Sequence, residues 1–132
     1  MISPRYAPLL MFVLLLTTLA CGGIGLAYEY DLTGDYAVWA PDLLAQAAVV
    51  QKIPETSSGT VVIPPMVVAY GWNDDFIIAQ RHPDLDSSVT EWYILVIAER
   101  AVHGPLTAAE FTQLRQDLGV PAALDFSQTI TP

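Results

Sequence analysis

The densest cluster of polar side chains that could carry chemistry is Asn73-Asp74-Asp75, which directly follows Gly71 and Trp72. Neighbouring carboxylates on a turn could hold a hard cation such as Ca²⁺, which prefers several oxygen ligands. The spacing is not that of an EF-hand loop, and a hairpin turn with Asp and Asn side chains bonded to local amides is the simpler interpretation. Because hairpin turns tend to be exposed, Trp72 with Asn73, Asp74 and Asp75 is also a candidate recognition tip.

No catalytic motif accompanies this cluster. His82 and His103 are the only histidines, and a zinc site needs three or four ligands in a compact geometry. The serines lack a G-x-S-x-G context, and there is no glycine-rich phosphate loop. We therefore expect no catalytic residue, no metal site and no cofactor. The alternative left open is a small metal-dependent or acid/base hydrolase that uses Asp74 and Asp75 with one of the two histidines.

The only cysteine, Cys21, ends an apolar stretch that carries no charge from Tyr6 to Ala20 and is preceded by Arg5. This stretch is too short to span a bilayer core of roughly 30 Å and has the size of a signal-peptide core. Small residues flank the cysteine on both sides, as in the run Ala20-Cys21-Gly22-Gly23.

The Cys21 arrangement resembles the lipobox of bacterial lipoproteins, in which the thiol is alkylated with diacylglycerol and the cysteine becomes the new N-terminus. Thr18 departs from the aliphatic residue usual three positions before that cysteine. A soluble secreted protein and an uncleaved anchor are the alternatives. The resemblance implies an exported chain, anchored in the cell membrane or the outer membrane, whose domain faces the periplasm or the outside of the cell. The resemblance also implies that the chain binds the membrane through the diacylglyceryl group on Cys21.

The domain organisation predicted on this basis has four parts. Residues 1–20 are a lipoprotein signal peptide, residues 21–27 a lipidated tether, residues 28–126 a single small domain and residues 127–132 a frayed tail. The net charge is −9, and all 14 acidic residues follow Cys21. Such a surface repels phosphate backbones, so nucleic acid is excluded as a partner.

The pattern of the domain favours an α+β fold. Alternating and β-branched segments separated by turn residues predict a small antiparallel sheet of about five to six strands connected as a meander. One helix follows near the C-terminus and packs on the sheet. Thr107 and Glu110 have the spacing of a capping box, while Gly119 and Pro121 mark the end of the helix.

Two segments together resemble a family of small bacterial lipoproteins classed only as a domain of unknown function. The first is a hairpin over residues 67–80 with the motif Gly-Trp-Asn-Asp-Asp-Phe-Ile-Ile-Ala, and the second runs from Trp92 to Val96 and on through Val102-His103-Gly104-Pro105-Leu106-Thr107 to Glu110-Phe111. The resemblance extends from Tyr28 to Val120. It departs from the family at Val96-Ile97-Ala98-Glu99-Arg100, where a polar strand end and a Lys-rich turn are usual. It implies export and a shared fold, and brings no activity with it.

These observations favour a membrane-anchored lipoprotein of the bacterial envelope. The expected role is a non-catalytic binding domain, with an envelope protein as the candidate partner.

Overall fold

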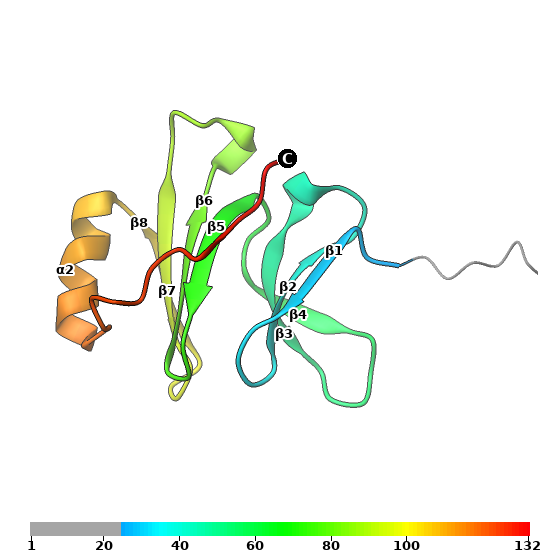
Figure 1. The fold of residues 1–132 in the computed structure, drawn as a ribbon, viewed down its shortest axis with the longest axis horizontal. Coiled ribbons are helices and arrows are strands. Elements are labelled where there is room, and N and C mark those ends of the chain that lie inside the picture. Colours follow the sequence, from blue (N-terminus) through cyan, green and yellow to red (C-terminus); the bar gives the residue numbers. More distant parts are fainter. Residues whose placement is uncertain (1–24) are drawn as a thin grey trace, which may run out of the picture.

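A computed structural model describes residues 25–132 of the chain (Figure 1). The predicted signal peptide and the lipidation at Cys21 lie outside these residues. Of the helices within residues 25–132, none has the length and apolar character needed to cross a membrane. The elements, in chain order, are β1 Tyr28–Asp31, β2 Tyr36–Ala40, η2 Leu44–Gln46, β3 Ala48–Lys52, β4 Gly59–Ile63, β5 Val67–Trp72, β6 Phe76–Arg81, η3 Pro83–Leu85, β7 Glu91–Val96, β8 Ala101–Leu106, α2 Ala108–Leu118 and β9 Gln128–Thr129.

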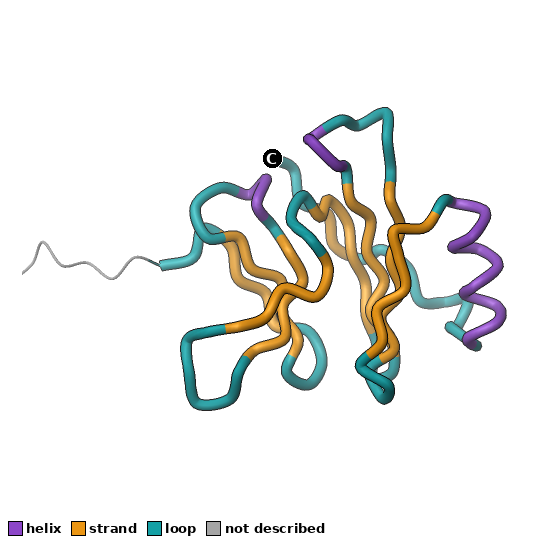
Figure 2. The backbone as a smooth tube through the Cα atoms, turned by 180° about the vertical axis from the view of Figure 1, so that it is seen from behind, coloured by secondary structure: helices purple, strands orange, loops and turns teal. Residues whose placement is uncertain are grey.

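The strands form two antiparallel sheets. The first has the order β1-β2-β3-β4 and the second the order β8-β7-β6-β5-β9. Figures 1 and 2 show three layers: the four-stranded sheet, the five-stranded sheet and α2, which covers only the outer face of the second sheet. The predicted α+β class, with antiparallel strands and one C-terminal helix, is confirmed. The structure adds that the strands, nine within residues 25–132, are divided between two packed sheets.

The main hydrophobic core lies between the two sheets. Alternate residues of β2 and β3, such as Val38 and Val49, face Tyr70 of β5 and Leu95 of β7 across this interface, and all four are fully buried. The alternation that predicts strands therefore also determines which side chains enter the core, because successive residues of a strand point to opposite faces. This core holds the sheets together as one unit.

A second core lies between the five-stranded sheet and α2. Ile78 and Ile94 on the outer face of the sheet contact Phe111 of the helix. The helix begins as predicted: the Thr107 hydroxyl accepts a hydrogen bond from the Glu110 N–H (3.2 Å), and the Glu110 carboxylate accepts one from the Thr107 N–H (3.0 Å). The hydrogen bond from the Thr107 N–H to the carboxylate lowers the pKa of Glu110.

The frayed tail predicted for residues 127–132 is wrong over Gln128 to Ile130. Gln128 and Thr129 form β9, which pairs with β5 at the edge of the second sheet. The Ile130 N–H donates to the Val68 carbonyl (2.8 Å), and the Ile130 side chain is only 6% exposed within the inter-sheet core. Burial of the Ile130 side chain and the backbone hydrogen bonds to β5 together offset the conformational freedom that this segment loses.

Candidate functional site

The predicted recognition tip is only partly exposed. Trp72 is the last residue of β5, pairs with Ile77, and is half-buried. Its ring stacks on Tyr70, with centroids 6.0 Å apart, and meets the edge of Tyr30 at 5.4 Å. The strand continues two residues further than the turn pattern of Gly71 indicates, so Trp72 lies at the end of β5 and its ring is half-buried.

The remaining residues of the tip form a hairpin turn. The Asn73 side-chain oxygen accepts hydrogen bonds from the Asp75 and Phe76 N–H groups, both at 2.8 Å. This is the local bonding that stabilises an Asx turn, so Asn73 has a structural role. Asp74 and Asp75 are exposed. The tip thus presents two carboxylates to solvent beside a tryptophan that is only partly exposed.

The histidines do not complete a metal site with these acids. Asp74–Asp75 and His82 lie at opposite ends of β6, which separates them by roughly 20 Å at about 3.3 Å per residue. His103 lies in β8 opposite Ile94, and its buried Nε2 atom has no hydrogen-bond partner among the residues that the structure describes. Among residues 25–132, no group of three His, Cys, Asp or Glu side chains is placed to hold a metal ion. Asp74 and His82 therefore cannot act together at one site.

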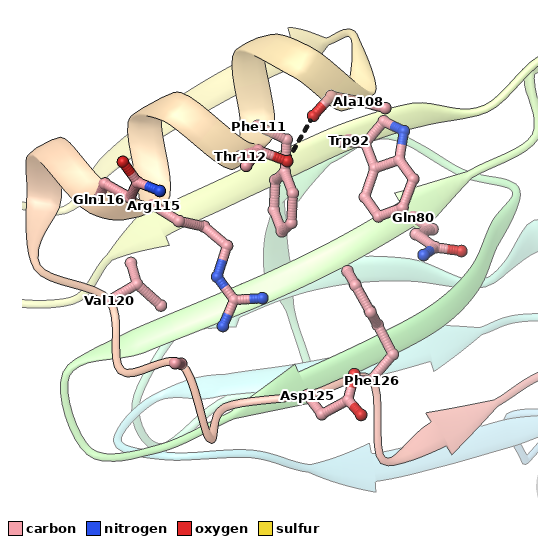
Figure 3. Close-up of a pocket in the computed structure, with 11 residues that line it drawn as sticks. Gln80, Trp92, Ala108, Phe111, Thr112, Arg115, Gln116, Val120, Asp125 and Phe126 are labelled. Atoms are coloured by element: carbon pink, nitrogen blue, oxygen red, sulfur yellow. Dashed lines mark hydrogen bonds between the residues drawn. The ribbon is translucent and has the colours of Figure 1, made fainter.

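A solvent-open groove of about 540 Å³ lies elsewhere, between α2, the five-stranded sheet and the segment that follows the helix (Figure 3). Its residues come from β6, β7, α2 and this returning segment. They are Gln80, Trp92, Ala108, Phe111, Thr112, Arg115, Gln116, Val120, Ala122, Asp125 and Phe126. A volume of this size lies within the range of small-molecule sites in proteins.

Three aromatic rings from three separate elements form one wall of the groove. Trp92 of β7 lies 4.9 Å from Phe111 of α2 and 5.5 Å from Phe126 of the returning segment, measured between ring centroids. Phe111 and Phe126 are 5.9 Å apart. Such pairs contribute about 0.5–1.5 kcal/mol each beyond their buried area, so the rings stabilise the groove as well as line it.

Arg115 extends from α2 into the same groove (Figure 3). Its Nη2 atom donates to the carbonyls of Pro121 (2.8 Å) and Leu124 (2.6 Å). The guanidinium carbon lies 5.5 Å from the centroid of the Phe111 ring. Within residues 25–132 no carboxylate is in ion-pair contact with Arg115, whereas Lys52 and Arg81 each pair with an acid. The side chain is thus held in one orientation by neutral groups, and its charge is not compensated.

The returning segment closes the groove because it approaches the sheet very closely. An added Cβ on Gly71 of β5 would lie 1.9 Å from the Asp125 carbonyl oxygen. Only glycine permits this approach, which places Phe126 beside Trp92. The sequence analysis does not predict the groove, because its patterns describe single elements and the lining residues come from separate segments of the chain. The one local signal was the presence of Leu124 and Phe126 after a helix that ends at Gly119.

Comparison with known proteins gives one result. The family described as "Protein of unknown function (DUF3997)" matches residues 33–130, which is most of the chain. The chain belongs to this family. No curated protein and no solved structure matches it. The match confirms the predicted membership of an uncharacterised family, and within this DUF3997 chain it spans the groove, the hairpin tip and β9.

Proposed function

We propose that this protein is an envelope lipoprotein, anchored through a lipidated Cys21, whose domain binds an envelope component in the groove beside α2. The observation that carries the binding role is the groove itself: an open cavity that combines three aromatic rings with an uncompensated, fixed guanidinium. Apolar walls with a few placed polar groups are the usual form of a ligand site. The proposed role is non-catalytic, and the domain faces the periplasm or the exterior.

The proposed anchor rests on the sequence around Cys21. Two acyl chains provide durable membrane attachment, whereas a single chain binds reversibly. The first strand begins at Tyr28, seven residues after Cys21. A tether of this length spans at most about 25 Å when extended. The domain would therefore remain close to the membrane that holds it, either the cell membrane or the outer membrane.

Cell fractionation of wild type and Cys21→Ser tests the anchor. We expect wild type in the membrane fraction, with a mature N-terminal mass that includes the diacylglyceryl group. The variant should lack the lipid mass and keep its signal peptide. If Cys21→Ser is processed and fractionates as wild type does, the lipoprotein assignment is wrong.

Groove filling tests the binding role. Ala122 and Ala123 are adjacent exposed residues, but only Ala122 lines the groove. We expect Ala122→Phe to lose the component that wild type retains from envelope extracts, and Ala123→Phe, the matched control, to keep it. Equal retention by both variants would count against the groove. Retention that is lost instead with Asp74→Ala would place the binding surface at the hairpin tip.

A further inference from the structure

We infer that the groove binds a small organic acid that has a flat, apolar body, with its carboxylate on Arg115 and its body against Trp92, Phe111 and Phe126. This inference rests on the proposed function, because it names the ligand class of the same groove. It is carried by the combination of a fixed cation, an aromatic wall and the charge of the rest of the chain.

Arg115 provides a positive charge in a fixed position. Arg115 donates from Nη2 to two carbonyls, at 2.8 and 2.6 Å, and lies over the Phe111 ring. Carbonyls and a ring face orient a guanidinium but leave its full positive charge. A guanidinium has five N–H donors in a planar fork, so further donors exist beyond those that Nη2 uses. Because the side chain is already ordered, less conformational entropy is lost when an anion binds.

Three aromatic side chains line the groove beside this charge. The ring centroids of Trp92, Phe111 and Phe126 lie 4.9 to 5.9 Å from one another, and all three residues line the groove. Phe111 is only 4% exposed, so the half-buried rings of Trp92 and Phe126 supply most of the accessible apolar surface. In Figure 3, Arg115 and Phe126 project from opposite sides into the space beside Phe111. A ligand that reaches both the guanidinium and the rings must therefore join a compact anion to an apolar body. Guanidinium pairs with carboxylates are geometrically matched and strong.

The rest of the chain surrounds the groove with negative charge. The chain carries a net charge of −9, and Asp125 lies in the wall of the groove, where its carboxylate accepts a hydrogen bond from the Phe126 N–H (2.8 Å). A negative field raises the free energy of any anion, and more so with each added charge. A single arginine offsets this repulsion for one carboxylate but not for several negative charges. The groove therefore selects a monoanion over phosphates or other polyanions.

The primary test compares 3-phenylpropionate with 3-phenylpropanamide, which differ in charge and not in body. The purified full chain is titrated with each, and the three indole N–H signals are followed by NMR. Only the Trp92 signal should shift, with the acid binding roughly tenfold or more tightly than the amide, as a charge-assisted pair implies. Equal binding of acid and amide, or no binding of either, overturns the inference. Tighter binding of a tripeptide that ends in a free Phe carboxylate also overturns it, and assigns the groove to a polypeptide C-terminus.

Gln116 provides charge variants that leave the Arg115 bonds in place, because it is exposed on the rim of the groove. Gln116→Glu should weaken 3-phenylpropionate binding by about two- to fivefold and Gln116→Lys should strengthen it by a similar factor, in line with an exposed charge at short range. Ser57→Glu, the matched charge control in an exposed loop of the first sheet, should change nothing. Identical affinities for both Gln116 variants contradict the assignment.

This test can fail while the proposed function stands. If Ala122→Phe abolishes retention of an envelope component but the acid and the amide bind equally, the groove is a binding site for a neutral ligand. If the acid binds as inferred but Ala122→Phe retains the component, the ligand class is supported, and the component is recognised elsewhere.

Discussion

At the scale of single residues, the most perturbed group is the phenol of Tyr70. It is fully buried, and its oxygen lies 2.6 Å from that of Tyr28. Burial raises the pKa of Tyr70 well above its ordinary value, and the hydrogen bond with Tyr28 raises it further. Burial, followed by the nearby Glu91 carboxylate, raises the pKa of Tyr93 as well. Both groups therefore keep their protons in the folded state at pH values where the unfolded chain loses them.

This raised pKa predicts a loss of stability in alkali. The stability that each raised pKa contributes is fully present below the unfolded tyrosine pKa of about 10. It falls by up to about 1.4 kcal/mol per pH unit between that value and the pKa of the group in the folded state. Urea denaturation from pH 8 to pH 11.5 measures the slope. Tyr70→Phe should make the decline above pH 10 shallower, whereas Tyr30→Phe, at an exposed ring, should not. A slope that Tyr70→Phe leaves unchanged would show that Tyr70 does not retain its proton.

Gly71 is the residue on which the closure of the groove depends. A methyl group there would lie 1.9 Å from the Asp125 oxygen. Gly71→Ala should therefore lower the free energy of unfolding by about 1–3 kcal/mol, as overpacking does, and displace Phe126 from Trp92. Urea denaturation and the chemical shift of the Trp92 indole measure the two effects. Gly25→Ala is the control, since no atom lies within 4 Å of its added Cβ. Wild-type stability of Gly71→Ala would contradict the close approach.

At the scale of elements, β9 is the one whose contribution is easiest to isolate. Ile130→Ala removes a side chain that is 6% exposed in the inter-sheet core, and truncation at such positions costs about 2–5 kcal/mol. Thermal or urea denaturation measures this loss. Thr131→Ala, at the next and exposed residue, should stay within about 0.5 kcal/mol of wild type. If Ile130→Ala is equally neutral, the tail is frayed as the sequence predicts.

The elements that the sequence predicts well are those specified by neighbouring residues. The capping box at Thr107 and the left-handed Gly119 (φ 73°) delimit α2 as expected. The β5–β6 hairpin forms around Asn73 because its side chain bonds to amides two and three residues away. Such contacts are local, so single-sequence patterns contain them.

The division into two sheets and the groove depend on contacts distant in sequence. The Val67 N–H bonds to the Ala47 carbonyl (2.9 Å), where the chain passes from the first sheet to the second. Phe126 meets Trp92, 34 residues earlier in the chain, only after the segment that follows α2 has turned back to the sheet. No periodicity specifies which strand a short tail will join. The residue types of the groove are therefore visible in the sequence, but their convergence is not.

At the scale of the whole molecule, the shared core predicts that both sheets unfold together. Ile63 of the first sheet and Ile77 of the second are fully buried in one cluster, so neither sheet keeps a covered face without the other. Trp39 reports on the first sheet and Trp92 on the helix side of the second. In variants that retain only Trp39 or only Trp92 of the three tryptophans, the two fluorescence transitions in urea should coincide, as in two-state unfolding.

A substitution in the shared core extends this test. Ile63→Ala should lower the free energy of unfolding by about 2–5 kcal/mol and move both tryptophan transitions by the same amount, although Trp92 lies on the outer face of the second sheet. Val61→Ala, at an exposed position of the same strand, should move neither. If Ile63→Ala shifts only the Trp39 transition, the sheets are separate folding units. The groove would then persist without the first sheet, and its ligand binding would survive conditions that unfold β1 to β4. Coincident transitions mean instead that any partner that binds the folded first sheet also stabilises the groove. Both regions unfold in one cooperative transition, so binding to either one raises the free energy of unfolding of the whole domain.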